Sequence, residues 1–172
     1  MIRAAFALEF LLAPVVAMAA GPGMTAPVSA PGLECRLRLP AAVRAGEPVP
    51  LQFELINRGK SVLHVLNWNT PLEGWFGRFL RVTFDGLEIP YQGPQVKRGL
   101  PEAGDYVAVG AGRSVRATLD LTQAYAMTAA GSYRIAFDGW LHDVTARTPS
   151  AGRQHPHPLA CAPVSVAILP PT

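Results

Sequence analysis

The stretch LECRLRL (residues 33–39) alternates apolar and polar side chains at every position, and VPLQFEL (residues 49–55) does so again with Val, Leu, Phe and Leu. Successive side chains of a β-strand point to opposite faces of its sheet, so this period of two is typical of a strand with one buried face. Two prolines and a glycine within residues 40–48 favour a turn between them. The two stretches therefore predict two half-buried strands.

Similar short runs continue along the chain and are separated by turn signals. Asn-Arg-Gly-Lys at 57–60 predicts a hairpin-type turn into the next strand, and glycine-containing turns are expected at 85–86, 110–112 and 130–131. We expect further strands at 61–68, 78–84, 87–91, 106–109, 114–121, 132–140 and 160–169. The pattern predicts about seven to nine antiparallel strands, and no amphipathic stretch of helical length interrupts them. We therefore expect an all-β, immunoglobulin-like β-sandwich in a single domain at 33–170.

Three local features add detail to this expectation. Residues 121–125 have the composition of one helical turn, and TPSAGRQHPHP (148–158) predicts an exposed loop. The sequence GSYRI (131–135) resembles the corner at which such sandwiches enter a late strand. Tyr133 is therefore expected to bond its hydroxyl group to the nearby backbone.

The composition is that of a folded single domain. Hydrophobic residues make up 49% of the 172 residues and charged residues only 16%, which is too apolar for a disordered chain. The 17 prolines and 16 glycines favour a turn-rich β protein. The net charge of +3 comes mainly from arginines scattered singly among acids, so no basic stripe could follow a phosphate backbone and no nucleic-acid partner is expected.

The N-terminus has the three parts of a secretory signal peptide. Arg3 supplies the cation, residues 4–16 are largely apolar, and Ala17-Met18-Ala19 is a small-residue ending. We expect a signal peptide at 1–19 and a flexible leader rich in Pro and Gly at 20–32. The domain would then be exported to the periplasm or the cell exterior, with no membrane span after signal removal.

Export changes how the two cysteines are interpreted. Cys35 lies in the first expected strand and Cys161 in the last one. In an oxidising compartment these thiols can form a disulfide that ties the two ends of the domain together. Two unpaired buried thiols are the alternative.

Common catalytic and metal-binding motifs do not occur in the sequence. It contains no H-E-x-x-H, G-x-S-x-G, P-loop or G-x-G-x-x-G pattern. The four histidines are His64, His142, His155 and His157, and the last two flank a proline without a neighbouring carboxylate or thiolate. Spacing alone does not exclude paired carboxylates, because a sandwich brings distant residues together. We expect no enzymatic activity, no cofactor and no metal site.

Two segments between strands are the candidate binding sites. LNWNTPLEGWFG (66–77) holds two tryptophans and a phenylalanine on an irregular connection, where they either fill the end of the sandwich or form an exposed binding surface. The candidate contact residues in it are Trp68, Asn69, Thr70, Pro71, Trp75 and Phe76. YQGPQVKRGLP (91–101) is a loop that presents Lys97 and Arg98, either as solvated cations or as a basic finger for a partner's cleft.

These segments carry a resemblance to a known family. Together they resemble the N-terminal, propeptide-like region of bacterial members of the deuterolysin and peptidyl-lysine metalloendopeptidase family, over about residues 33–139. The similar parts, in the same order, are Asn57 and residues 65–74, 82–86, 91–94, 96–99, 112–114, 120–125 and 131–133. In that family the region precedes a zinc protease domain with an H-E-x-x-H motif, which this sequence lacks.

The resemblance implies a propeptide role without catalysis. The protein would bind a secreted zinc metallopeptidase of the deuterolysin type, as an inhibitor or a folding chaperone, and would be a monomer when free. Lys97 would enter an acidic specificity pocket, Arg98 would pair at its rim, and segment 68–76 would add apolar contact area. The alternatives are a module for adhesion or glycan binding that uses the tryptophans for stacking, and an assembly role through a free sheet edge.

Overall fold

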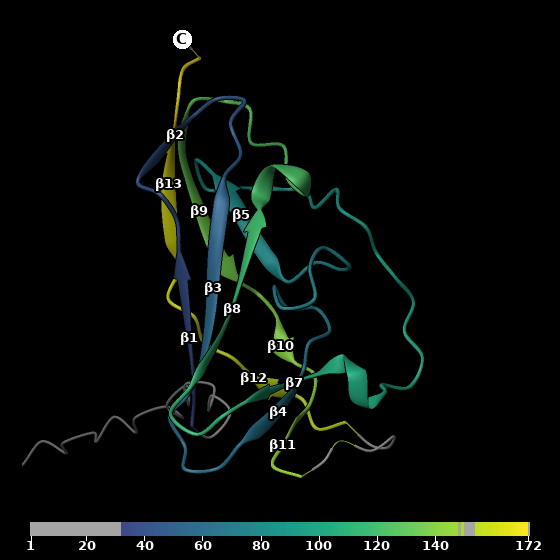
Figure 1. The fold of residues 1–172 in the computed structure, drawn as a ribbon. Coiled ribbons are helices and arrows are strands. Elements are labelled where there is room, and N and C mark those ends of the chain that lie inside the picture. Colours follow the sequence, from purple (N-terminus) through teal and green to yellow (C-terminus); the bar gives the residue numbers. More distant parts are fainter. Residues whose placement is uncertain (1–31, 148, 150–153, 172) are drawn as a thin grey trace, which may run out of the picture.

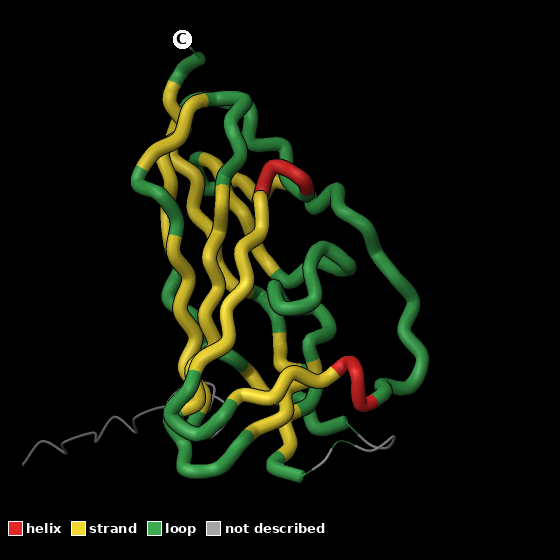
Figure 2. The backbone as a smooth tube through the Cα atoms, in the orientation of Figure 1, coloured by secondary structure: helices red, strands yellow, loops and turns green. Residues whose placement is uncertain are grey.

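The computed structural model describes residues 32–147, 149 and 154–171 of the chain. The expected signal peptide (1–19), and all of the expected leader except Gly32, lie outside the described residues. The described part is mostly β-structure arranged in several sheets, with two short 3-10 turns as its other regular elements (Figures 1 and 2). Within it, no helix has the length and apolar character needed to span a membrane.

Three strands form the first of two larger sheets. β3 lies in the middle and pairs antiparallel with β1 on one side and with β8 on the other. Every second residue at the start of β3 is buried, so the period of two in the sequence reflects the two faces of this sheet. The predicted strands in this part of the chain are confirmed as β1 (Leu33–Arg38), β3 (Pro50–Asn57) and β8 (Ser114–Asp120).

The second larger sheet has five strands in the order β2-β13-β9-β5-β6. Its members are β2 (Ala42–Arg44), β13 (Val164–Leu169), β9 (Gly131–Phe137), β5 (Leu80–Phe84) and β6 (Leu87–Ile89). β2 pairs in parallel with β13, whereas the other pairs are antiparallel. The expectation of antiparallel strands alone is therefore wrong for β2, which was also not predicted because a strand this short shows no alternation.

The core of the protein lies between these two sheets, which face each other in Figure 1. Leu51, Phe53 and Leu55 point inward from β3, and Ile135 does so from β9. The ring of Phe53 lies 6.1 Å from that of Phe137 on the opposite sheet. Burial of each large apolar side chain of this kind contributes about 1.5–3 kcal/mol, so this layer holds the two sheets together.

Two small sheets and two 3-10 turns complete the fold. β4 (Leu63–Leu66) pairs with β7 (Tyr106–Val109) and β11 (Val144–Thr145), and β10 (Trp140–Leu141) pairs with β12 (His157–Pro158). The 3-10 turns are η1 (Ala103–Asp105) and η2 (Leu121–Gln123), of which η2 confirms the expected helical turn. β12 corrects the expectation of an irregular loop up to residue 158, and β10, β11 and β12 are too short for alternation to reveal them.

The turn predicted at residues 57–60 is not a hairpin. β3 and β4, the strands on either side of it, lie in different sheets. The Asn57 side-chain amide donates hydrogen bonds to the carbonyl oxygens of Ser61 and Val109, at 2.7 and 2.9 Å, and its Oδ1 accepts one from the Gly59 N–H. These bonds carry the chain away from β3 and across to the sheet that contains β7.

The turn predicted at residues 85–86 is confirmed, and it is a two-residue hairpin. Phe84 and Leu87 are the last paired residues of β5 and β6. Asp85 and Gly86 between them have φ angles of 48° and 80°. Positive φ at both central positions is the geometry that matches the twist of a hairpin, and Asp-Gly is a preferred sequence for it.

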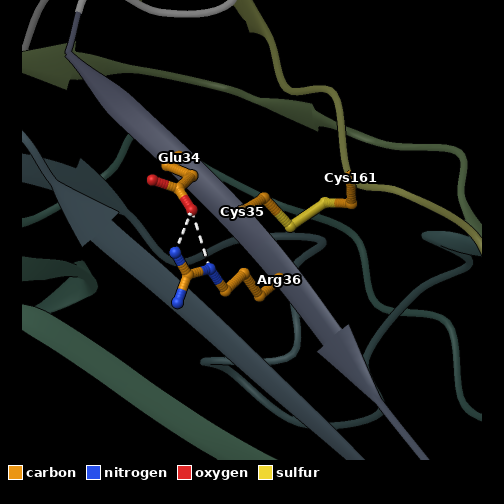
Figure 3. Close-up of a disulfide and its surroundings, with 4 residues drawn as sticks. All are labelled: Glu34, Cys35, Arg36 and Cys161. Carbon is orange, nitrogen blue, oxygen red and sulfur yellow. Dashed lines mark hydrogen bonds and ion pairs between the residues drawn. A yellow bond between two sulfur atoms is a disulfide. The ribbon is translucent and has the colours of Figure 1, made fainter.

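A disulfide joins Cys35 and Cys161, which confirms that prediction (Figure 3). Cys35 lies on β1 of the first sheet, and Cys161 precedes β13 of the second, with a Cα–Cα distance of 4.9 Å. Beside it on the outer face of β1, Arg36 forms an ion pair with Glu34. The covalent link therefore connects the two sheets near the edge where β1 lies.

Tyr133 has the structural role expected from the sequence. Its side chain is buried, and its hydroxyl donates a hydrogen bond of 2.9 Å to the carbonyl oxygen of Ala129. The same hydroxyl accepts a hydrogen bond of 3.1 Å from the Ala129 N–H. The connection that leads into β9 is thus fixed to the strand that follows it.

Candidate functional site

The aromatic segment 66–77 is divided between the core and the surface. Trp68, Thr70, Pro71 and Trp75 are buried, whereas Phe76 is 44% exposed. The two interpretations of this segment therefore apply to different residues. Its tryptophans fill the interior, and Phe76 is available at the surface.

Trp75 packs within a cluster of aromatic rings. Its ring stacks on that of Phe79 at a centroid distance of 5.1 Å and meets the edge of Tyr125 at 6.0 Å. Its indole N–H donates a hydrogen bond of 3.2 Å to the carbonyl oxygen of Asp120, at the end of β8. A tryptophan with its polar atom satisfied in this way is a core residue that fixes the segment against the first sheet.

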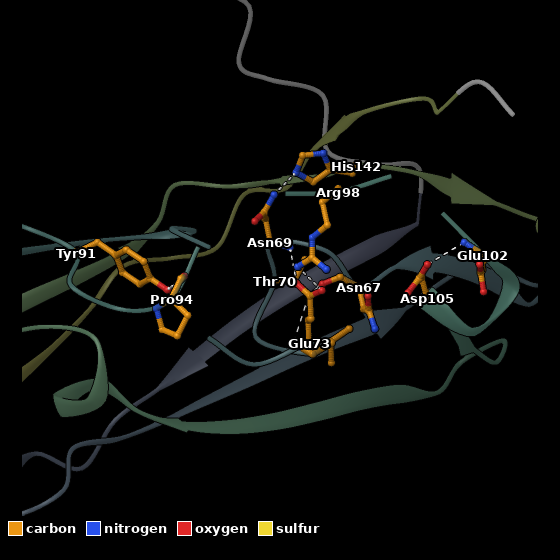
Figure 4. A network of polar contacts seen from close by, with 11 residues as sticks. Asn67, Asn69, Thr70, Glu73, Tyr91, Pro94, Arg98, Glu102, Asp105 and His142 are labelled. Carbon is orange, nitrogen blue, oxygen red and sulfur yellow. Dashed lines mark hydrogen bonds and ion pairs between the residues drawn. The ribbon is translucent and has the colours of Figure 1, made fainter. Parts of the chain in front are cut away.

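Arg98 contacts both Trp68 and Glu73, and Figure 4 shows it beside Glu73. The Arg98 guanidinium carbon lies 5.1 Å from the centre of the Trp68 ring, and the guanidinium group forms an ion pair with the Glu73 carboxylate. The Glu73 side chain is only 10% exposed, so water screens this pair less than a surface pair. Arg98 therefore attaches loop 91–101 to the aromatic segment.

Hydrogen bonds hold loop 91–101 at further points. The Tyr91 hydroxyl donates a bond of 2.8 Å to the Pro94 carbonyl, which closes the start of the loop on itself (Figure 4). The Gln92 N–H donates to the Ala124 carbonyl at 2.8 Å. Just beyond the far end, the Glu102 N–H donates to the Asp105 carboxylate at 2.8 Å and caps η1. The loop has no strand or helix of its own, yet it is attached to other segments at Gln92, Val96 and Arg98.

Lys97 is the cation that this anchored loop exposes. It has no ion pair with any of the described residues, in contrast to the neighbouring Arg98. Val96 and Leu100 on either side are 42% and 74% exposed. The Val96 N–H donates a hydrogen bond of 3.3 Å to the Phe76 carbonyl, which brings the exposed Phe76 into the same region. We call Phe76, Val96, Lys97 and Leu100 the loop surface.

Asn69 and Thr70 shape the aromatic segment from within. The Thr70 hydroxyl donates a hydrogen bond of 2.6 Å to the Asn67 carbonyl and accepts one from the Leu72 N–H. Asn69 has a φ angle of 52°, a left-handed conformation that asparagine tolerates better than most residues. Both residues therefore stabilise an irregular backbone.

His142 joins this arrangement from the end of β10. The Asn69 side-chain amide lies 3.1 Å from His142 Nε2, and as a donor it requires that nitrogen to be unprotonated (Figure 4). Burial lowers the pKa of His142, Glu73 opposes this effect, and Arg98 adds to it. The neutral imidazole is thus the form that fits the site.

Sequence reasoning did not identify Glu73 and His142 as members of this site. Glu73 is the one acidic residue within residues 66–77, and that isolation was an available signal for a partner of Arg98. His142 gave no comparable signal, because the fold alone brings it beside Asn69. In the part of the chain that the structure describes, no three His, Cys, Asp or Glu side chains are grouped so that they could hold a metal ion.

Comparison with known proteins relates the chain to a protease. No protein-family model matches the sequence. An extracellular protease from Aeromonas hydrophila is 30% identical to the chain over 124 residues. The chain is similar to part of a larger protease. The matched region is 72% of this chain but only 35% of the Aeromonas protein.

This similarity supports part of what the sequence predicted. The sequence predicted a region that accompanies a protease, and the similarity to part of an extracellular protease agrees with this. The extracellular relative and the Cys35–Cys161 disulfide both favour export. The type of protease and the role of the region belong to the proposal below.

Proposed function

We propose that this chain is a propeptide-like, non-catalytic domain that binds a secreted zinc metallopeptidase of the deuterolysin type and keeps it inactive. The observation that carries the proposal is the partial similarity to the Aeromonas extracellular protease, which covers 35% of that protein. The resemblance described from the sequence adds the zinc metallopeptidase class. A related role, assistance in folding of the protease, would use the same binding surface.

The proposal includes an immunoglobulin-like fold for the domain. Three features support it: two sheets packed face to face, a disulfide between them, and a buried tyrosine that bonds its hydroxyl to the backbone before a late strand. Such sandwiches present loops at their ends on a rigid frame, which suits them to recognition. The loop surface lies mainly on the connection between β6 and η1, which runs along the side of the molecule in Figure 1.

The proposed contact places Lys97 in an acidic pocket of the protease. Lys97 is exposed and unpaired among the described residues, whereas Arg98 forms an ion pair with Glu73 and stacks on Trp68. Arg98 therefore acts as an anchor of the loop, and Lys97 is the charge available to a partner. A desolvated charge pair at the centre of an interface can be a hot spot, and Phe76, Val96 and Leu100 would surround it with apolar area.

The anchors of the loop also favour inhibition over cleavage. A protease cuts a segment that can adapt to its active site, and an inhibitor avoids this by holding its loop in one conformation. The loop is fixed at Gln92, at Val96 and at Arg98 by bonds to other parts of the chain, and Tyr91 bonds to Pro94 within the loop. A loop ordered before binding also loses less conformational entropy on binding, which increases affinity.

The test is a titration of the purified protein into a deuterolysin-type metallopeptidase while cleavage of a lysine-containing peptide is followed. We expect stoichiometric loss of activity. Lys97→Ala should weaken inhibition by about tenfold or more, as expected for a hot-spot residue. Lys60→Ala is the matched control, because Lys60 is the other lysine of the chain and is also exposed.

Two results would contradict the proposal in different ways. Equal inhibition by Lys97→Ala and the intact protein would refute the proposed contact while leaving the role intact. No inhibition by the folded protein, together with no increase in the yield of active protease when denatured protease refolds in its presence, would refute the role itself. An increase in refolding yield alone would favour the chaperone function.

The burial of the tryptophans bears on the alternative of glycan binding by stacking. Trp68 is 6% exposed and Trp75 is 9% exposed, so neither ring offers a free face to a sugar. No observation on these two residues favours that alternative over the protease-binding role.

A further inference from the structure

The outer face of the five-stranded sheet contains a hollow that the proposed function does not use. Its volume is about 310 Å³, and it is open to solvent. The residues that line it are Arg81, Thr83, Gly86, Glu88, Arg134, Ala136 and Pro163. This size is at the lower end for ligand pockets and fits a molecule smaller than a drug.

The sheet register explains why these residues meet. Thr83 on β5 lies opposite Arg134 on β9, and Arg81 lies opposite Ala136, so all four side chains share the outer face. Val82 and Ile135 between them are buried in the core. Arg81 and Arg134 are therefore diagonal neighbours on adjacent strands, a separation that long side chains can bridge.

The positive charges of this hollow have no partners. Neither Arg81 nor Arg134 forms an ion pair with any of the described residues, and both are exposed. Glu88 also lines the hollow, but its carboxylate pairs with Arg78 at 3.2 Å. The two arginines thus place two planar guanidinium groups, each with five N–H donors, side by side, and among the described residues no carboxylate pairs with either of them.

The outer face of the other sheet provides a contrast. There, Arg36, Arg38 and Arg116 line a hollow of only about 30 Å³. Arg36 forms an ion pair with Glu34 and Arg116 with Glu54, whereas Arg38 has no ion pair with any of the described residues. Two of the three arginines of this smaller hollow are therefore matched by acids, whereas neither Arg81 nor Arg134 is.

We propose that this hollow binds a small hydroxylated carboxylate, of the size of a single sugar acid. Arg81 and Arg134 would hold the carboxylate, since guanidinium groups match its geometry through paired hydrogen bonds. The Thr83 hydroxyl would donate or accept hydrogen bonds at neutral hydroxyl groups of the ligand, and the Glu88 carboxylate would accept them. Glu88 also disfavours a second negative charge, which makes a monocarboxylate the better fit than a multiply charged anion.

The test is a titration of the isotope-labelled protein followed by backbone amide shifts in NMR spectra, with sodium glucuronate as the probe. Acetate and glucose, at the same ionic strength, supply the carboxylate alone and the hydroxyl groups alone. We expect saturable shifts of the Thr83, Arg134 and Ala136 amides with glucuronate. Acetate and glucose should each bind at least about tenfold more weakly. Equal binding of acetate and glucuronate would overturn the proposal.

Variants separate a built site from general attraction to a basic protein. Arg81→Ala/Arg134→Ala should weaken glucuronate binding about tenfold or more. Arg44→Ala/Arg113→Ala removes the same charge from two other exposed arginines that are unpaired among the described residues, and it should leave binding unchanged. If both double variants lose the same affinity, the attraction is nonspecific and the proposal is wrong.

Two conservative variants keep the test decisive. Arg81→Lys/Arg134→Lys retains both charges but loses the paired donor geometry, and it should also weaken binding. Thr83→Val should weaken glucuronate binding but leave acetate binding unchanged, because only the hydroxylated ligand uses the threonine hydroxyl. The amide spectra report the fold of each variant. None of these residues belongs to the loop surface, so failure here leaves the protease-binding proposal standing.

Discussion

Removal of the Cys35–Cys161 disulfide should destabilise the protein strongly. The link closes a loop with a sequence separation of 126 residues. In the chain-entropy account, a crosslink over about 126 residues removes about 16 cal/mol/K from the unfolded chain, which is about 5 kcal/mol at room temperature. Domains of this kind have a total stability of about 5–15 kcal/mol, so the loss would be a large part of it.

Urea unfolding of three samples measures this effect. The samples are the oxidised protein, the same protein with the disulfide reduced, and Cys35→Ala/Cys161→Ala. If the free energy of unfolding falls by about 2 kcal/mol per molar urea, the urea concentration at the unfolding midpoint should be about 2–3 M lower in both samples without the crosslink. The slope of the free energy of unfolding against urea concentration should also become steeper, because the unfolded chain without a crosslink exposes more surface.

The reduced sample separates the crosslink from packing. Cys35 is 7% exposed within the core, so its replacement by alanine also removes packing contacts. Reduction keeps both sulfur atoms and breaks only the bond between them. A loss below about 1 kcal/mol in the reduced protein would refute the reasoning, since the two sheets would then be held by their core alone.

Three further predictions concern single side chains. Tyr133→Phe should cost about 1 kcal/mol in urea unfolding, because it removes both hydrogen bonds to Ala129 while water can reach the exposed Ala129 backbone. Burial lowers the pKa of His142 in the folded protein. The stabilisation from the neutral ring is therefore present above pH 6.5, the usual pKa of histidine, and is lost as the pH falls through the lower folded pKa. NMR titration of the ring should show the lowered pKa, and Asn69→Ala should alter that pKa. Burial raises the pKa of Tyr106 to about 12 from 10, so stability should fall as the pH rises from 10 towards 12, and Tyr106→Phe should reduce that fall in alkaline unfolding curves.

Alternation in the sequence predicted the longer strands because it reports directly on which face of a strand is buried. β1 and β3 follow it over most of their lengths, and the Asp-Gly pair identified the turn between β5 and β6. Which strands pair depends on contacts across the whole chain. The turn at residues 57–60 has hairpin composition, but Asn57 uses its side chain to redirect the backbone to another sheet, an effect that local composition does not reveal.

The sequence indicated the two segments that form the candidate site, but it did not show which of their side chains are buried or paired. Both segments and both cations could be selected from the sequence, because aromatic side chains and adjacent charges on irregular connections are unusual. Whether a given ring is buried depends on what covers it, and Trp68 is covered in part by Arg98 from another segment. The difference in role between Lys97 and Arg98 likewise follows from the position of Glu73, which the fold determines.

In the proposed binding role, this difference between Lys97 and Arg98 would help the loop to recognise its partner. If both cations were free, the loop would present two flexible side chains, and a partner would have to order both of them on binding. The Arg98 ion pair and its contact with Trp68 fix the backbone next to Lys97 at the expense of one charge. One lysine on a held backbone, with Val96 and Leu100 exposed on either side, then offers a partner a single charge in a defined position. Loss of the anchor should therefore weaken binding even though Lys97 itself is retained.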